Sequence, residues 1–163
     1  MRSILIVLFI LLNMVGNTKE NLKEIISKTH FTSEIKTFNL KNGTKFSSYN
    51  SKGTWENNLG NYGIIKCMGT VKKMLNNEID LNIMCESNDK NGYTGWSLLK
   101  RTGNMESGVG YAEIIDSTIP DKDLWIGTKC TYATNYLNNV GFTMQKCPLS
   151  NKLYDKFISY NSK

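Results

Sequence analysis

Few residues of this 163-residue chain could carry out catalysis. His30 is the only histidine, so any Ser-His-Asp or Cys-His arrangement would have to use it. No catalytic signature surrounds any serine, and we expect the cysteines to be oxidised. The sequence therefore predicts no catalytic residue and no cofactor.

The acidic residues offer a second kind of chemistry. Glu113 lies in a predicted strand, and Asp116, Asp121 and Asp123 follow in the next loop. A glycosidase needs two carboxyl groups about 5–9.5 Å apart across a cleft, which spacing along the chain does not define. The loop also lacks the regular Asp/Asn alternation and the glycine of a calcium-binding loop. We expect these side chains to be solvated and predict no metal site.

The four cysteines form an even set that is typical of two disulfides in an exported protein. A structural zinc site would require closely spaced cysteine pairs, and these cysteines are far apart. Placing Cys67 opposite Cys85 in a hairpin centres the turn on Asn76, in a turn-compatible stretch. The same register gathers the apolar residues on one face and pairs Lys66 with Glu86 on the other, whereas a one-residue slip would invert the faces.

Cys130 and Cys147 follow the same logic. Their midpoint falls between Asn138 and Asn139, which accept the positive φ of a two-residue turn. Counting outward from that turn makes the cysteines a non-hydrogen-bonded pair, where side chains approach closely enough for a disulfide. We therefore predict the bridges Cys67–Cys85 and Cys130–Cys147.

The N-terminus has the pattern of a signal peptide. Arg2 precedes an apolar run from Ile4 to Leu12, and small residues lead to a cleavage site after Gly16. The run is shorter than the ~20 apolar residues of a membrane span. We expect a signal peptide at 1–16, a single domain at 17–163, and a secreted or periplasmic protein without a membrane span.

The remaining sequence predicts an all-β domain. Leu22, Ile25 and Ile26 have helical spacing and predict a short N-terminal helix over Lys19–Thr29, and a closing helix follows Leu149. Between the two helices, short apolar runs alternate with turn residues, which favours an antiparallel eight-stranded meander closed into a barrel, with a β-sandwich as the alternative. The expected strands are Glu34–Leu40, Thr44–Tyr49, Tyr62–Met74, Glu78–Ser87, Thr94–Thr102, Gly108–Ile115, Thr128–Leu137 and Val140–Cys147.

The basic residues are scattered along the chain. The formal net charge is +6, but only Lys72-Lys73 and Lys100-Arg101 are adjacent basic pairs. No basic stripe is interleaved with aromatics in the manner of a nucleic-acid-binding protein. We therefore expect a monomer with no nucleic-acid partner.

Four segments carry a family resemblance: Gly53-Thr54-Trp55, Gly60-Asn61-Tyr62-Gly63, Gly108-Val109-Gly110-Tyr111 and Lys129-Cys130-Thr131-Tyr132. In this arrangement the chain resembles small secreted bacterial proteins of unassigned function, which in turn resemble the allene-oxide-cyclase/dirigent type of eight-stranded barrel. Asp116–Pro120 stands where those barrels typically carry a Gly-Thr-Gly turn, and no position matches the catalytic residues of the cyclases. The resemblance implies a fold and transfers no chemistry.

An eight-stranded barrel is either filled by its own side chains or holds one small ligand. Aromatic residues at the expected barrel rims would suit an apolar or sugar-like ligand, unless they plug the barrel or cover its outside. Our leading hypothesis is a non-enzymatic binding protein. The alternatives are an isomerase or cyclase acting inside the barrel, with Glu113 and Tyr111 as first candidates, and a structural or inhibitory domain with a filled interior. The candidate ligand-contacting residues are Trp55, Tyr62, Trp96, Tyr111, Glu113 and Trp125.

Overall fold

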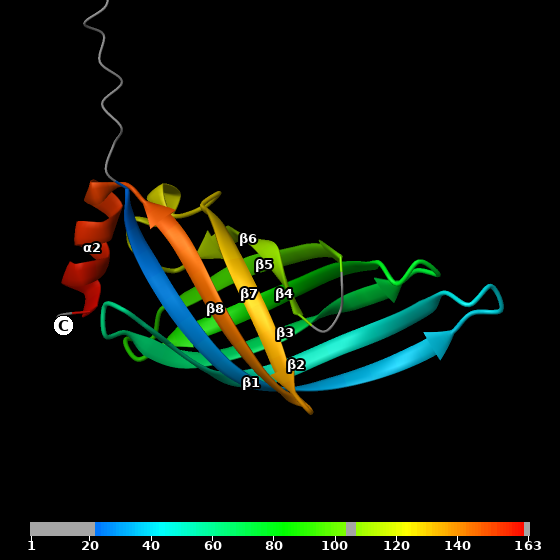
Figure 1. The fold of residues 1–163 in the computed structure, drawn as a ribbon. Helices are drawn as coiled ribbons and strands as arrows, with labels where there is room; N and C mark the ends of the chain where they lie inside the picture. Colours follow the sequence, from blue (N-terminus) through cyan, green and yellow to red (C-terminus); the bar gives the residue numbers. More distant parts are fainter. Residues whose placement is uncertain (1–21, 104–106, 162–163) are drawn as a thin grey trace, which may run out of the picture.

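The computed structural model describes residues 22–103 and 107–161. Eight antiparallel strands follow one another in chain order and close into a barrel (Figure 1). The predicted eight-stranded meander barrel is therefore confirmed, and a β-sandwich is not formed. The predicted signal peptide, 1–16, lies outside the described residues. The elements are β1 (Lys23–Asn39), β2 (Lys45–Asn57), β3 (Tyr62–Lys73), β4 (Ile79–Asp89), β5 (Thr94–Gly103), β6 (Ser107–Ser117), the 3₁₀ helix η2 (Lys122–Leu124), β7 (Lys129–Leu137), β8 (Val140–Leu149) and α2 (Asn151–Asn161).

The predicted N-terminal helix is wrong. The described part of that segment is the start of β1, which pairs with β2 along one edge and with β8 along the other. Ile25 faces the interior and is buried, and Ile26 is less buried, as strand alternation requires. The helical spacing of Leu22, Ile25 and Ile26 was a local signal, and the need to close the barrel overrides it because β1 is the only strand that joins β2 to β8. β1 and β2 are consequently much longer than the strands expected at Glu34–Leu40 and Thr44–Tyr49.

The two disulfide hairpins have the predicted register. Cys67 lies opposite Cys85 and Lys66 opposite Glu86, and the turn places Asn77 at a φ of 64°. Leu137 pairs with Val140 across the second turn. The bridges Cys67–Cys85 and Cys130–Cys147 are both present, with Cα–Cα distances of 4.1 and 4.3 Å. These short distances fit non-hydrogen-bonded antiparallel pairs.

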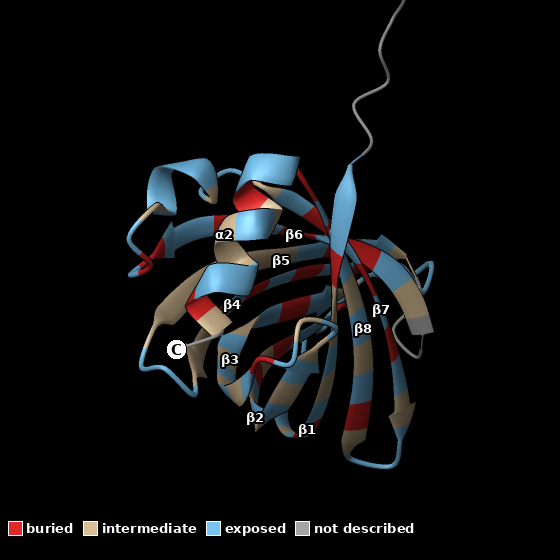
Figure 2. Cartoon of the chain, turned by 90° about the vertical axis from the view of Figure 1, so that its left-hand side faces the viewer, coloured by how far each residue is buried: buried red, intermediate tan, exposed pale blue. Residues whose placement is uncertain are grey.

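One end of the barrel is covered by α2, as Figure 2 shows from that side. We call it the helix end. The β1–β2 and β3–β4 hairpins project at the opposite end, which we call the hairpin end (Figure 1). The predicted C-terminal helix is confirmed, and its Leu153 and Tyr160 are buried against the barrel.

Two apolar clusters form the core, and each contains one of the disulfides. The first cluster consists of Ile25, Ala112, Ile114, Cys130, Tyr132, Cys147, Leu149 and Leu153. The second consists of Phe31, Tyr49, Val71, Ile79, Leu81, Ile83 and Cys85.

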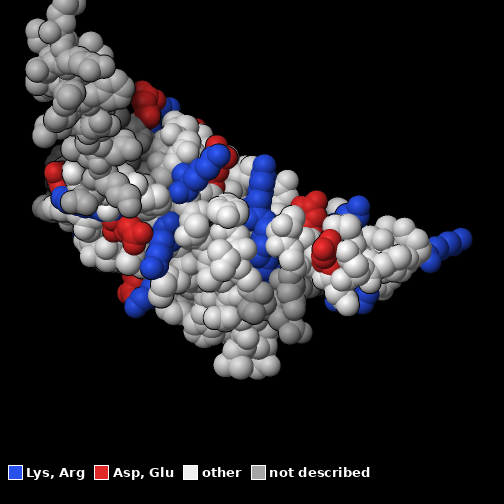
Figure 3. Space-filling view, turned by 45° about the horizontal axis from the view of Figure 1, so that its top comes forward, with Lys and Arg blue, Asp and Glu red and all other residues white. Residues whose placement is uncertain are grey.

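The surface of the barrel carries charges of both signs. On the face drawn in Figure 3, Lys and Arg side chains are interspersed with Asp, Glu and uncharged surface. No helix in the described part of the chain is both long and apolar enough to cross a membrane.

Candidate functional site

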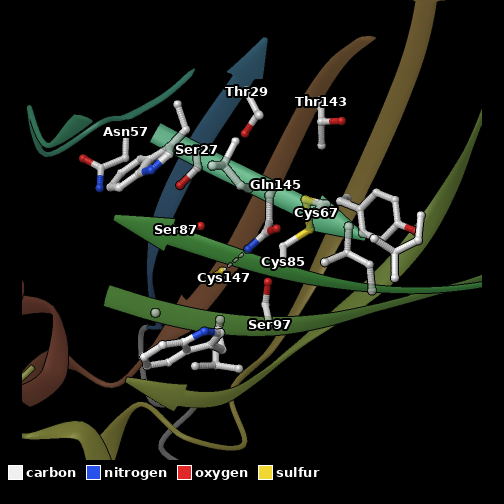
Figure 4. A pocket seen from close by; sticks show the side chains of 18 of the residues that line it. Ser27, Thr29, Asn57, Cys67, Cys85, Ser87, Ser97, Thr143, Gln145 and Cys147 are labelled. Carbon is white, nitrogen blue, oxygen red and sulfur yellow. Dashed lines mark hydrogen bonds between the residues drawn. A yellow bond between two sulfur atoms is a disulfide. The ribbon is translucent and has the colours of Figure 1, made fainter. Parts of the chain in front are cut away.

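The barrel interior contains a cavity of about 200 Å³, lined by residues of all eight strands. We call this cavity the lumen (Figure 4). A dry cavity of roughly 150 Å³ is large enough to bind benzene. The lumen therefore has room for one small molecule and is not filled by the protein's own side chains.

The middle of the lumen has apolar walls. Sulfur atoms of both disulfides reach it, through Cys67 and Cys85 on one side and Cys147 on another. Aliphatic side chains fill the spaces between the sulfurs. The strands present them here because alternation places every second residue on the inner face, in step with the cysteines. These aliphatic residues are Ile25, Ile65, Ile83, Leu99 and Ile114.

Small polar side chains interrupt these apolar walls. Ser27, Thr29, Ser87 and Ser97 line the lumen, and none of their hydroxyls hydrogen-bonds to another described residue. Gln145 also projects into the cavity, where its Nε2 lies 3.3 Å from Cys147 Sγ (Figure 4). Sulfur is a weak acceptor, so the amide keeps most of its hydrogen-bonding capacity. The lumen thus combines an apolar surface with donors and acceptors that are open to a ligand.

Three tyrosines and an arginine occupy a further part of the lumen wall. Burial raises the pKa of Tyr49 well above its ordinary value, and the nearby Tyr136 raises it further. Burial also raises the pKa of Tyr132 to about 12, while the positive charge of Arg101 acts in the opposite direction. These two phenols are therefore neutral hydroxyl groups at physiological pH. Arg101 is only 5% exposed and lines the same cavity.

Tryptophan side chains surround the helix end of the lumen. Trp55, Trp96 and Trp125 line it, and Trp125 packs edge-on against Phe157 of α2 with ring centroids 5.0 Å apart. The indole Nε1 of Trp96 donates to Glu86 Oε2 at 3.1 Å, which fixes the orientation of that ring. Aromatic side chains and α2 together form the cover of this end.

Polar contacts fasten α2 to the loop between β6 and β7. Lys156 Nζ lies 2.8 Å from Asp121 Oδ2, and the Tyr160 hydroxyl donates to the same carboxylate. The hydrogen bond from Lys156, and to a smaller extent the one from Tyr160, lowers the pKa of Asp121. Asn91 Nδ2 also donates to the carbonyl oxygen of Tyr160 at 3.0 Å. Polar contacts from the β4–β5 and β6–β7 loops thus help to hold the cover in place.

The six residues singled out from the sequence divide into two groups. Trp55, Trp96 and Trp125 come together around the lumen. Tyr62 is 58% and Tyr111 66% exposed on the outside of the barrel, and Glu113 is exposed beside Tyr111. Tyr111 and Glu113 instead border a shallow surface depression with Leu98, Lys100 and Lys129.

The inward residues that sequence reasoning missed are Gln145, Arg101, Tyr132 and the lumen serines. A signal for Gln145, Tyr132 and Ser87 was present, because each disulfide marks which residues of its own strands face inward. Cys130 faces the interior, so Tyr132 and Thr134 on the same strand must do so as well. The same alternation places Tyr111 outside, because Cys130 lies opposite its neighbour Ala112.

Neither His30 nor the acidic loop assembles a catalytic or metal site. His30 is exposed on the outside, where its ring packs edge-on against Phe142 at 5.3 Å. Within 22–103 and 107–161, no group of three or more His, Cys, Asp or Glu side chains is arranged to hold a metal ion.

No protein-family model matches this chain, and no curated protein matches its sequence. The function must therefore be inferred from the chemistry of the lumen.

Proposed function

We propose that this chain is an exported barrel protein that binds one small amphipathic molecule in its lumen. The observation that carries the proposal is the cavity of about 200 Å³ between the two disulfides. Its apolar walls suit a hydrocarbon or aromatic body, and the free hydroxyls of Ser27, Thr29, Ser87 and Ser97 suit a ligand with polar atoms. Ligand sites in proteins commonly combine such an apolar lining with a few polar groups.

Export is the setting that the disulfides favour. Two disulfides and no free cysteine fit an oxidising compartment outside the cytosol or in the periplasm. The signal-peptide pattern that ends at Gly16 supplies the route, so the exported protein should begin at Asn17. We also propose kinship with the allene-oxide-cyclase/dirigent barrels, which the closed eight-stranded meander supports at the level of fold alone.

Binding is favoured over an isomerase or cyclase activity by where the acidic groups lie. Glu113 and Tyr111, the first candidates for an acid or base, are exposed on the outer face. Asp89 is the only carboxylate among the described lining residues. Its oxygens accept hydrogen bonds from the backbone N–H groups of Asn91 and Tyr93 and from the amide of Asn61. Asp89 therefore stabilises the β4–β5 loop instead of facing a substrate as a base.

The proposal is tested by filling the lumen. Ser97→Phe places a ring in the cavity, and Thr70→Phe places the same ring on the exposed face of β3 as a matched control. Saturation-transfer NMR with benzyl alcohol and benzoate should detect binding to the native protein and to Thr70→Phe, but not to Ser97→Phe. Circular dichroism verifies that all three proteins are folded. Absence of binding to the native protein, or equal binding to Ser97→Phe, would contradict a ligand in the lumen.

A further inference from the structure

Two neighbouring strands line the lumen with a block of polar side chains. Ser27 of β1 lies opposite Gln145 of β8, and Thr29 lies opposite Thr143 two residues further along β1. All four residues line the cavity, on the two strands drawn side by side in Figure 4. We call these four residues the β1–β8 polar patch.

The patch contains hydrogen-bonding groups that the protein does not use. The hydroxyls of Ser27 and Thr29 make no hydrogen bond to any described residue. Within the described part of the chain, the Gln145 amide makes one polar contact, from its Nε2 to Cys147 Sγ at 3.3 Å. Sulfur is a weak acceptor, and the amide oxygen of Gln145 accepts nothing from the described residues.

The next polar pair on the same wall behaves differently. Thr143 Oγ1 lies 2.7 Å from Thr134 Oγ1 on β7, so these two hydroxyls share a hydrogen bond within the protein. The open groups are therefore concentrated at Ser27, Thr29 and Gln145. Because polar groups enclosed in a protein are normally hydrogen-bonded, this concentration indicates a partner that lies in the cavity.

The charged groups of the lumen wall already have partners. Asp89 and Arg101 are the only charged side chains among the described lining residues. Asp89 accepts hydrogen bonds within its own loop, and Arg101 has an interaction partner within the protein. The polar patch itself carries no charge. A charged group of a ligand would therefore be buried there without a counter-charge, which is strongly unfavourable.

The patch instead suits an uncharged group that both donates and accepts hydrogen bonds. Serine and threonine hydroxyls and the glutamine carboxamide all have donors and acceptors. A hydroxyl or a carboxamide on the ligand has both as well, so each of its polar atoms can find a partner. The facing wall is apolar, because β4 lies four strands away from β8 in the closed barrel and contributes Ile83 and Cys85.

We propose that the β1–β8 polar patch binds an uncharged hydroxyl or carboxamide group of the lumen ligand, whose apolar body lies against the Cys67–Cys85 disulfide. This inference rests on the proposed function, because it names the polar group of the lumen ligand. Gln145 Nε2 would donate to the oxygen of that group, and Gln145 Oε1 or the Ser27 hydroxyl would accept from its N–H or O–H. The cavity of about 200 Å³ limits the body to one ring or a short chain.

Three probes of one shape test the charge of the ligand. Benzamide is uncharged, benzoate is an anion and benzamidinium is a cation, and each has a planar head of the same size on the same ring. Isothermal titration calorimetry at neutral pH measures their dissociation constants for the native protein. We expect benzamide to bind at least about tenfold more tightly than either ion, because a buried charge without a partner costs more than its hydrogen bonds return.

A substitution in the patch tests where the polar group binds. Gln145→Met keeps the length of the side chain and removes its amide. It should weaken benzamide binding about fivefold, the effect of one hydrogen bond between uncharged groups. It should not weaken binding of ethylbenzene, which has no polar group. Asn135→Leu is the matched control, since it removes a carboxamide from the exposed face of β7 and should change neither affinity.

The outcomes separate this inference from the proposed function. Either ion binding as tightly as benzamide would overturn the uncharged group, and unchanged benzamide binding by Gln145→Met would overturn the role of the patch. Binding of ethylbenzene alone would overturn both of these claims. Each of these results leaves a lumen ligand standing. The comparison of the three probes uses the native protein, so it remains a test if Gln145→Met does not fold. If none of the four compounds binds, the proposed function is overturned as well.

Discussion

The two ends of the barrel are closed by different means. At the hairpin end, side chains of the strands themselves fill the interior, with Phe31 and Tyr136 packed edge-on at 5.8 Å among aliphatic residues. At the helix end, closure depends on α2, a separate element that the chain adds after the last strand (Figure 2). The helix is attached by apolar contacts of Leu153, Phe157 and Tyr160, and by polar contacts to Asp121 and Asn91 in the neighbouring loops.

The difference indicates which end opens. Displacing the hairpin-end residues would require the strands to separate, because those side chains belong to the sheet. Displacing α2 breaks only the contacts of a single helix and leaves all eight strands paired. Local opening of this kind occurs where few buried contacts hold an element. We therefore expect ligands to enter at the helix end, past Trp125 and Phe157.

The largest expected effect comes from removing a disulfide. The bridges join cysteines 18 and 17 residues apart, and closing a loop of this length stabilises a protein by about 3 kcal/mol. Cys67→Ala/Cys85→Ala and Cys130→Ala/Cys147→Ala should each lower the free energy of unfolding in urea by about that amount. Only the second pair lies in the cluster with Leu153, so only its loss should also expose α2 to trypsin at Lys152 and Lys156. Equal trypsin cleavage of α2 in both variants would contradict the claim that the two ends of the barrel are closed by different means.

A smaller effect is expected from loosening the anchor of α2. Leu153→Ala removes a side chain that is 3% exposed, and such truncations destabilise by about 2 kcal/mol where the element can shift into the gap. The loss should appear as faster hydrogen exchange of α2, with the strand amides unchanged. Ile158→Ala serves as the control, because the Ile158 side chain lies on the same helix and is 44% exposed. Faster exchange throughout the strands would show that α2 and the barrel open as one unit.

The smallest effect concerns the polar contacts of α2. Tyr160→Phe removes the hydroxyl that donates to Asp121, a change worth about 1 kcal/mol in docking of the helix. The pKa of Asp121 is lowered in the folded protein, because the bonds to α2 favour its charged form. Asp121 therefore stabilises the docking of α2 above the ordinary carboxyl pKa, and this stabilisation is lost as the pH falls below about 4. Trypsin is inactive at this pH, so pepsin digestion is the measurement: α2 should become susceptible on acidification, and Asp121→Asn should remove this pH dependence.

Lys23→Ala breaks the exposed ion pair with Asp155 and should change the free energy of docking of α2 by less than about 0.5 kcal/mol.

The sequence predicts the hairpins well because their determinants are local. Cys67 and Cys85 fix a register that the charged pair Lys66–Glu86 independently supports, and the structure has the same pairs. The helix predicted over Lys19–Thr29 fails for the opposite reason. Its residues satisfy a helical pattern locally, but β1 is specified by pairing with β8, more than a hundred residues away in the chain.

The site could be predicted only in part. Tryptophans suggested a lumen lining, and Trp55, Trp96 and Trp125 do line it. The position of Tyr62 and Tyr111 at the expected barrel rims predicts the same lining for them, but alternation from Cys67 and Cys130 places both outside. The register between β5 and β6 shifts at Trp96/Ser97, and no residue pattern marks that irregularity. The approach of Arg101 to Tyr132 depends on how three strands lie together, which no single segment encodes.

The pairing of β1 with β8 has a consequence for how the molecule forms. These strands are the first and last of the sheet, so the barrel cannot close until nearly the whole chain is present. Contacts between residues so distant in sequence are slow to form, because a long loop must be ordered first. A chain that is still being synthesised lacks β8 and leaves both edges of its sheet unpaired. Such a chain remains open until its last strand has been made.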